Sequence, residues 1–344
     1  MKSNIIEEFN SISLSHKITV NKDDFHQFIN GLYQAEGTMG AYFPKKDSLK
    51  IVFYFSIGKN YSPESLDVLL SLQKILSIGR VKLEFGSKGV PHIRYTITNT
   101  EDIFNIAIPY FSLLYGKKRK NIVVLKRIKE LLIRGLEYSE LNKAYISEII
   151  HLVYSINPYG QNRKLSLTEK LKIFNCSLSK CKNIQVEENN NLPSKLFIIG
   201  LFLGDGSIGF VFDSPPSRLP RFYIKIVFNF AAQNSDIQLL IYIAERMSLK
   251  PQISIRKSGM MGLEYSGNTV FKVIIPFLTE YKNGLFWRKD HFTTIQNISV
   301  FYLKKNHLTK EGLKTIVELL YSRPNKYIKS KQHWIDLIHK RIWK

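Results

Sequence analysis

The stretch LFIIGLFLGDGSIGF, residues Leu196 to Phe210, decides the fold of this chain. A nearly unbroken apolar run ends there in one acidic residue, Asp205, which lies between two glycines. A second copy of the pattern, FINGLYQAEGTMG, runs from Phe28 to Gly40 and has Glu36 at the acidic position. Two copies separated by the length of a domain predict an internal duplication.

The residues that follow each copy match as well. IVFYF at Ile51–Phe55 pairs with IVFNF at Ile226–Phe230, and IPYF at Ile108–Phe111 pairs with IPFL at Ile275–Leu278. The spacing between the copies drifts by only a few residues, and a turn-rich insertion, DSPPSRLPR at Asp213–Arg221, explains the largest drift. The two halves are therefore predicted to have the same fold.

Each half is predicted to begin with a helix. Phe25, Phe28, Ile29 and Leu32 recur at the spacing of one apolar helix face. We expect Asp23 or Asp24 to cap the first helix and Ser194 to cap the second. The elements expected next are strands at Leu49–Ile57 and Phe222–Phe230, helices at Pro63–Leu76 and Ser235–Met247, hairpins at Val81–Thr98 and Gln252–Ile275, and a basic helical tail.

One strand alternates clearly between polar and apolar residues. Residues 223, 225, 227 and 229 form a more polar face, whereas Ile224, Ile226, Phe228 and Phe230 form an apolar face. This predicts an antiparallel sheet that packs on one side only. The domains are expected at residues 20–137 and 192–344, the second ending in a basic helix. A linker that packs some helix and carries the basic patch NPYGQNRKLS is expected at 138–191.

The charge of the chain indicates a polyanionic partner. Its 344 residues include 50 Lys and Arg against 28 Asp and Glu, a formal net charge of +22. Nucleic acid is the default partner, because Lys and Arg neutralise phosphates and release counterions. A membrane surface is the competing interpretation, but no long basic amphipathic helix favours it. The two cysteines exclude a disulfide framework, no apolar run reaches about 18 residues, and the N-terminus lacks a transit-peptide pattern.

Small residues recur at a helical spacing in both copies. Gly31 and Ala35 in the first copy, and Gly200 and Gly204 in the second, form a narrow stripe along one helix face. Such stripes let two helices approach until their backbones touch. We expect these helices to pair at a domain interface, bringing Glu36 and Asp205 together, with a glycine after each acid turning the chain into its first strand.

A pair of carboxylates without histidine or cysteine suits Mg²⁺. Mg²⁺ held between carboxylates and phosphate oxygens is the apparatus of phosphodiester hydrolysis. Glu36 and Asp205 could instead be ordinary helix-end residues. The helix dipole disfavours an anion at a C-terminus, however, so its repetition in both copies favours a functional role.

The two motifs resemble those of the LAGLIDADG homing endonucleases, in the single-chain, two-repeat form of mitochondrial group I introns. The matching segments are INGLYQAEG at 29–37 and IIGLFLGDG at 198–206. The resemblance implies an α+β fold of two αββαββα repeats, with saddle-shaped antiparallel sheets and paired motif helices. It also implies a monomer that cuts both strands of a long non-palindromic DNA target and leaves 3′ overhangs.

The resemblance assigns roles to individual residues. Glu36 and Asp205 would bind two or three divalent ions, helped by the carbonyls of Ala35 and Gly204. Lys118 in KKRK and Arg288 in WRKD align with each other and would lie near the scissile phosphates. Two positions depart from the family, because Gln34 and Leu203 stand where it frequently has an acid, usually not a catalytic one.

Polar residues beside aromatic ones on the expected strands are candidates for reading DNA in the major groove, although a solvated sheet face explains them equally well. The candidates are Lys50, Tyr54, Ser56, Lys82, Glu84, Arg94 and Thr96 in the first half, and Tyr223, Lys225, Asn229, Ser254, Arg256 and Ser258 in the second half.

Two other functions stay open. An RNA maturase that assists splicing of its host group I intron would use the same scaffold, and intron RNA could bind the basic C-terminal segment at Lys326–Lys344, which contains Trp334 and Trp343. A DNA-binding protein without catalysis is the third interpretation, which the two acids argue against. The resemblance places the protein in the mitochondrial matrix, encoded by the organelle.

Overall fold

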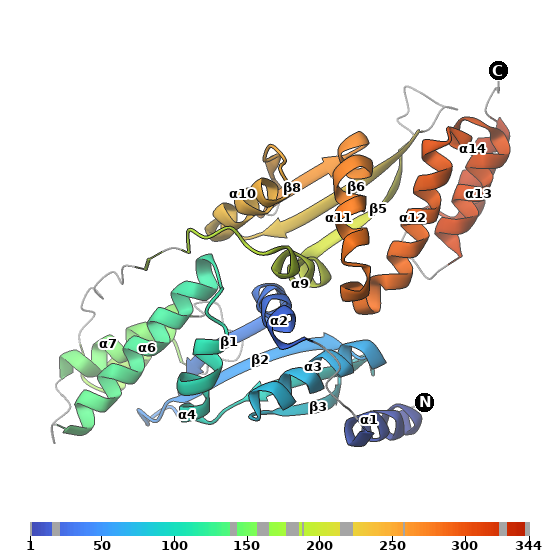
Figure 1. Cartoon of the computed structure of the whole chain (residues 1–344). Helices are drawn as coiled ribbons and strands as arrows, with labels where there is room; N and C mark the ends of the chain where they lie inside the picture. The colour runs from blue at the N-terminus through green and yellow to red at the C-terminus, as the bar shows by residue number, and fades with distance from the viewer. Residues whose placement is uncertain are drawn as a thin grey trace. The chain divides into compact units, whose positions relative to one another are not determined.

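The computed structural model describes residues 2–15, 21–137, 143–156, 165–176, 186–187, 189–213, 223–256, 259–322 and 329–340. The chain forms two compact units, Met1–Gly204 and Asp205–Lys344 (Figure 1). The second motif helix therefore lies mostly within the first unit. The domain boundaries expected from the sequence stay a prediction.

The first unit contains one copy of the predicted order of helices and strands. Its elements are α1 (Lys2–Ser15), α2 (Lys22–Glu36), β1 (Gly37–Tyr42), β2 (Val52–Asn60), α3 (Pro63–Leu76), β3 (Arg80–Phe85), β4 (Pro91–Ile97), α4 (Thr100–Asp102), a helical turn at Ile103–Ala107, α5 (Ile108–Tyr110), α6 (Gly116–Glu137), α7 (Lys143–Ile156), α8 (Leu167–Ile173) and most of α9 (Lys195–Asp205).

The second unit repeats the order from its first strand onward and adds C-terminal helices. Its elements are β5 (Gly206–Asp213), β6 (Tyr223–Ala232), a turn at Asn234–Asp236, α10 (Ile237–Arg246), β7 (Ile253–Ile255), β8 (Met261–Ser266), a helical turn at Val270–Ile274, α11 (Ile275–Glu280), a turn at Lys282–Arg288, α12 (Lys289–Leu303), a turn at Asn306–Leu308, α13 (Lys310–Tyr321) and α14 (Lys331–Lys340).

The two sheets have the same topology. Each has four strands, in the orders β1-β2-β4-β3 and β5-β6-β8-β7, and every neighbouring pair is antiparallel. In the registers, Gly37 pairs with Ile57 and Gly206 pairs with Phe230, so the two motif glycines occupy equivalent positions. The predicted α+β fold with two repeats is confirmed.

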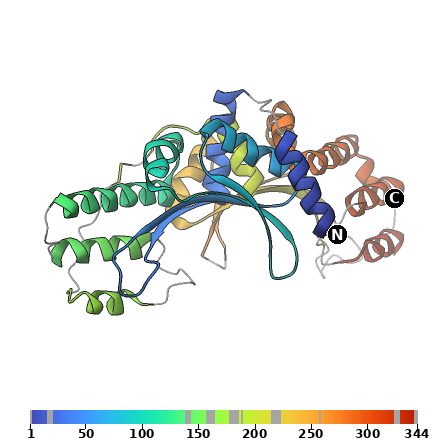
Figure 2. The ribbon, with the colours of Figure 1, turned by 90° about the horizontal axis from the view of Figure 1, so that it is seen from below.

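Alternation along the strands determines which face of each sheet is buried. Ile224, Ile226, Phe228 and Phe230 are all buried, as the sequence pattern predicts. Phe53, Phe55 and Ile57 of β2 form the corresponding core face of the first sheet. In Figure 2, α3 and α6 lie along one side of the first sheet, so the helices of this unit cover the apolar face and leave polar strand residues on the other.

Three local predictions need correction. Asn21, not Asp23 or Asp24, caps α2, because its side chain accepts hydrogen bonds from the backbone N–H groups of both aspartates. Strand β2 begins at Val52 rather than residue 49. The second hairpin ends at Ser266, after which Val270–Ile274 is helical rather than extended.

Other local predictions hold. Helix α3 spans Pro63–Leu76, as predicted from the sequence, and Ser62 caps it. The Ser194 hydroxyl accepts a hydrogen bond from the Phe197 N–H at 3.1 Å at the start of α9. The linker contributes α7 and α8, whereas most of its basic patch, the insertion after β5 and Cys181 lie outside the described residues. Within the described ranges, no helix combines the length and apolar character needed to cross a membrane.

Candidate active site

The small residues of α2 and α9 let the two helices meet backbone to backbone. A Cβ atom added to Gly31 would lie 1.8 Å from the Phe197 carbonyl oxygen, and one added to Gly200 would lie 1.9 Å from the Phe28 carbonyl oxygen. Only glycine fits at such distances, because the obstructing atoms belong to backbone that cannot move aside. The two motif helices, α2 and α9, therefore pack against each other, as the fold prediction stated.

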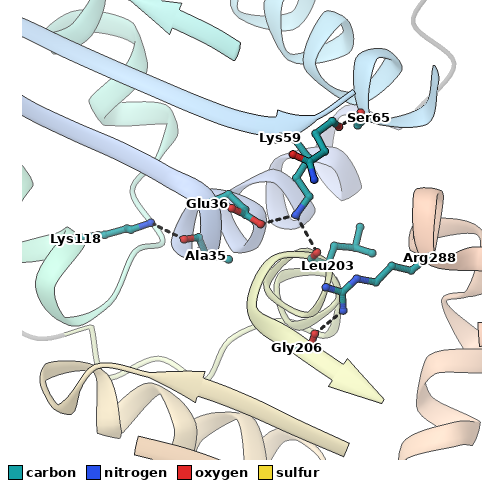
Figure 3. Close-up of polar contacts among 9 residues, drawn as sticks. Ala35, Glu36, Lys59, Ser65, Lys118, Leu203, Gly206 and Arg288 are labelled. Carbon is teal, nitrogen blue, oxygen red and sulfur yellow. Dashed lines mark hydrogen bonds and ion pairs between the residues drawn. The ribbon is translucent and has the colours of Figure 1, made fainter. Parts of the chain in front are cut away.

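Glu36, the last residue of α2, forms an ion pair with Lys59 at the end of β2 (Figure 3). The ammonium of Lys59 also donates a hydrogen bond to the Leu203 carbonyl, at 3.4 Å. The Glu36 side chain is 29% exposed and that of Lys59 is 19% exposed, so the pair is partly screened but still reachable from solvent. The acid of the first motif thus has a cationic partner already.

Lys118, at the start of α6, binds the C-terminal end of α2. Its ammonium donates hydrogen bonds to the carbonyls of Tyr33 at 2.6 Å, Gly37 at 2.6 Å and Ala35 at 3.3 Å. A cation beside the last carbonyls of a helix stabilises the negative end of the helix dipole. Lys118 therefore offsets the cost of placing Glu36 at this helix end.

Arg288 occupies the corresponding position in the second unit. Its guanidinium donates a hydrogen bond to the carbonyl of Gly206, the glycine that follows Asp205 (Figure 3). Gly206 is the counterpart of Gly37, which accepts from Lys118. The two basic residues aligned by sequence thus contact equivalent carbonyls, each inside its own unit.

Gln34 and Leu203, which depart from the family pattern, are both buried. The Gln34 side-chain oxygen accepts a hydrogen bond from the Tyr115 N–H at 3.0 Å, which ties α2 to the segment before α6. A glutamine can satisfy a buried N–H without the cost of burying a charge. These two positions support the helix pair and add no carboxylate to the site.

The motif glycine Gly37 is needed for space rather than for backbone conformation. Its φ is −70° and its ψ is 148°, an extended conformation open to any residue. A Cβ atom there would lie 2.2 Å from the Tyr33 ring. The predicted turn into the first strand is present, but the reason for glycine is the close approach of Tyr33.

The donors available at the first motif fit a hard divalent cation. They are oxygens only, namely the Glu36 carboxylate and the carbonyls at the end of α2, which is the set that Mg²⁺ and Ca²⁺ prefer. The Ala35 carbonyl is shared with Lys118, so it could contribute only in part. Across the ranges that the structure describes, no three His, Cys, Asp or Glu side chains gather into a metal site. Phosphate or water oxygens would have to complete the coordination.

The polar face of the first sheet carries most of the predicted DNA-reading residues. Lys82 and Glu84 are exposed, and Arg94 donates to Glu84 at 3.1 Å from the neighbouring strand. Thr96 and Tyr54 are half-buried on the same face. Two candidates differ from this pattern. Ser56 is buried with its hydroxyl 2.8 Å from that of Thr38, and Lys50 is exposed but precedes the strand.

The polar face of the second sheet is described in part. Lys225, Asn229 and Ser254 belong to it, and the guanidinium of Arg256 donates to the Asn229 side chain at 3.1 Å. Gly262 leaves room for this contact, because a Cβ there would lie 2.9 Å from the Arg256 Nε. Tyr223 begins β6, although its side chain is outside the described part, as is all of Ser258.

Sequence reasoning missed Lys59 and His92. Lys59 is a charged residue at a core-facing position of β2, and this break in the alternation could have revealed it. Its counterpart in β6, by register with the motif glycines, is Ala232. The His92 ring lies beside Gly58 on the polar face, and partial burial, reinforced by Arg94, lowers its pKa.

Comparisons with known proteins show a similarity to one family of endonucleases. Residues 29–130 match the model of the LAGLIDADG endonuclease family. A curated relative, described as probable intron-encoded endonuclease 2 of Neurospora crassa, is 26% identical over 319 residues, which cover 86% of this chain. The matched region spans 64% of the length of that relative.

Solved structures of DNA-bound homing endonucleases share the fold of the chain. The I-SmaMI LAGLIDADG homing endonuclease bound to cleaved DNA is 22% identical, with a TM-score of 0.69 covering 89% of this chain and 97% of that chain. The I-LtrWI LAGLIDADG homing endonuclease bound to target DNA is 21% identical, with a TM-score of 0.72 over 90% and 100%. A further I-SmaMI complex was obtained with an uncleaved DNA target and calcium ions.

Proposed function

Because the chain carries a LAGLIDADG endonuclease domain at residues 29–130 and has the fold of the two-repeat enzymes, we propose that it is a homing endonuclease. It would hydrolyse one phosphodiester bond on each strand of a long, non-palindromic DNA duplex, depend on Mg²⁺, and leave 3′ overhangs. We further propose that it acts as a monomer in the mitochondrial matrix.

One observation carries this proposal. Each motif helix ends in a carboxylate, Glu36 or Asp205, and a basic residue donates to the carbonyl of the glycine that follows it. An anion at the C-terminus of a helix is unfavourable as mere structure, yet carboxylates that can hold a divalent ion are what phosphodiester hydrolysis requires. Its occurrence in both repeats supports one site for each DNA strand.

The residues divide the work as follows. Glu36 and Asp205 would hold the divalent ions, which when bound activate water and stabilise the leaving oxygen. Lys118 and Arg288 would fix the helix ends and present positive charge to the scissile phosphates. The polar strand faces would bind base edges, with Arg94 and Arg256 suited to guanine and Asn229 suited to adenine.

Cleavage of a randomised plasmid library in Mg²⁺ tests the proposal. The intact protein should linearise members that carry one long asymmetric site. Replacing Glu36 with Gln, or Asp205 with Asn, should abolish double-strand cutting while leaving binding to the selected site within about twofold, because neither change removes a phosphate-binding cation.

The matched control is Glu245→Gln, the same chemical change at an exposed position on α10, which should cut like the intact protein. Double-strand cutting by both single variants would show that the acids are assigned wrongly. If the intact protein cuts no library member but promotes splicing of an intron RNA, the maturase function replaces the nuclease.

A further inference from the structure

Lys170 of α8 is a buried lysine that the proposed chemistry does not use. Only 1% of its surface is exposed, although lysine is almost never fully buried without partners. It belongs to the linker between the repeats and is distant in sequence from both motifs. A buried ammonium needs hydrogen-bond acceptors around it, since its desolvation is otherwise prohibitive.

The acceptors come from the loop between β1 and β2. The Lys170 ammonium donates to the carbonyls of Ser48 at 2.8 Å, Lys46 at 2.8 Å and Lys45 at 3.2 Å. An ammonium has three N–H groups, and three carbonyls receive them, so the charged form fits this environment. The Phe43 ring lies 4.3 Å and the Phe174 ring 5.0 Å from the nitrogen, adding cation–π attraction.

The same loop exposes basic side chains. Lys45, Lys46 and Lys50 are all exposed, and Asp47 is the only acid among residues 43–51. Lys170 thus holds the backbone of the loop from inside while its lysine side chains remain in solvent. Burial of Lys170 lowers its pKa, and Asp47 acts in the opposite direction.

Contacts at the start of α8 and with α7 fix the position of α8. The Ser166 N–H donates to the Glu169 carboxylate at 2.7 Å and the Glu169 N–H donates to the Ser166 hydroxyl at 3.3 Å, which together form a capping box. The Tyr154 hydroxyl of α7 donates to the Leu165 carbonyl at 2.9 Å, and its ring packs against Phe43. In Figure 2, α7 and α8 lie beside the end of the first sheet from which the β1–β2 loop extends.

We propose that Lys170 is a positioning residue that holds the loop at residues 43–51 as a binding surface for the phosphate backbone of duplex DNA. The linker would then be part of the DNA-binding surface of the first repeat rather than a tether. Pre-ordering the loop removes the entropy cost of ordering three lysine-bearing residues when DNA binds. This inference rests on the proposed function for the identity of the partner.

The test measures binding of a mixed-sequence DNA duplex as a function of salt concentration. The loop variant Lys45→Ala/Lys46→Ala/Lys50→Ala should reduce the slope of log K against log salt by about 2 to 3, since each lost phosphate contact removes about 0.9. Lys170→Met should reduce this slope by at least half as much as the loop variant does. The variant that combines both changes should reduce the slope no more than the loop variant alone, because both changes affect the same DNA-binding surface.

A matched control removes three exposed lysines of the second unit, Lys304, Lys314 and Lys331, giving the same change in net charge. It should change the slope less than the loop variant does. Hydrogen exchange should show faster exchange at residues 43–50 in Lys170→Met, with β3 and β4 unchanged, which separates loop release from general unfolding.

If the intact protein binds DNA, either of two results would overturn the inference. One is a loop variant whose salt slope equals that of the matched control, a result that does not depend on whether Lys170→Met folds. The other is additive loss in the combined variant. Failure of the intact protein to bind any duplex would instead overturn the proposed function, and this inference with it.

Discussion

The ion pair between Glu36 and Lys59 is the most informative contact at the scale of single residues. An acid at a helix C-terminus is unfavourable, and here Lys59 and Lys118 compensate it from two directions. Lys59 occupies a core-facing position of β2, where an apolar residue would be ordinary. We infer that Lys59 competes with a divalent cation for the Glu36 carboxylate.

Replacing Lys59 with Met should therefore tighten divalent binding. Removing a partly exposed ion pair, worth up to about 1 kcal/mol, should lower the half-saturating Ca²⁺ concentration by about two- to fivefold. Calorimetric titration of the protein–DNA complex with Ca²⁺, which does not require cleavage, measures this. Lys126→Met removes an equal charge from an exposed position on α6 that is not among the candidate DNA-binding residues. An equal shift in both variants would show that only net charge matters.

The helix pair α2–α9 is the feature that matters most at the scale of elements. Its contact is made by backbone, so glycine at Gly31 and Gly200 is a requirement of distance rather than of helix propensity. Glycine costs a helix interior about 1 kcal/mol relative to alanine. The chain accepts that cost twice, because the close approach brings the end of α9 to the end of α2, where Gly204 meets Ala35.

Gly31→Ala should therefore destabilise the protein, although alanine is the better helix former. The added methyl group must displace backbone 1.8 Å away, and we expect the free energy of unfolding to fall by about 1–3 kcal/mol or more. Urea denaturation measures the loss. Gly209→Ala in β5 is the control, because nothing lies within 4 Å of the added atom. Equal stability of Gly31→Ala and the intact protein would refute the contact.

The two repeats are alike in topology and unlike in chemistry when the molecule is considered as a whole. Glu36, Lys118 and Lys59 in the first repeat correspond to Asp205, Arg288 and Ala232 in the second. The side chain of Glu36 is longer than that of Asp205. A cation, Lys59, is present in the first repeat, whereas the equivalent position in the second repeat is Ala232. We infer that the two DNA strands are hydrolysed at unequal rates.

Supercoiled plasmid carrying the selected target should accordingly pass through a nicked circle before it becomes linear. Labelling each strand at its end should show that one strand is cut first in most molecules, because the two sites stabilise their transition states differently. Ala232→Lys makes the two repeats more alike and should change the ratio of the two nicks. Equal nicking of both strands by the intact protein would contradict the inference.

Sequence determined the duplication, the two motif helices and the strand alternation, because each depends on a local pattern or on similarity between the halves, whereas the meeting of Glu36 and Asp205 stays a prediction. The alignment of Lys118 with Arg288 also came from sequence, and their contacts with equivalent glycine carbonyls agree with it. Prediction from sequence failed where several neighbouring residues could cap the same helix. At the start of α2, the Asn21 side chain accepts hydrogen bonds from the backbone N–H groups of Asp23 and Asp24, so Asn21 is the cap.

Tertiary structure alone decided the partners of the charged residues. Lys59 lies 23 residues from Glu36, and Lys170 lies more than 120 residues from the loop carbonyls that it binds. A break in the alternation of β2 marks Lys59 as unusual, but it does not name Glu36 as its partner, and nothing in the local sequence distinguishes Lys170 from the lysines that remain in solvent. Strand register brings Lys59 to the helix end, and packing of the linker brings Lys170 under the loop. The sequence specifies the charge of a side chain, whereas its environment forms only when distant segments of the chain pack around it.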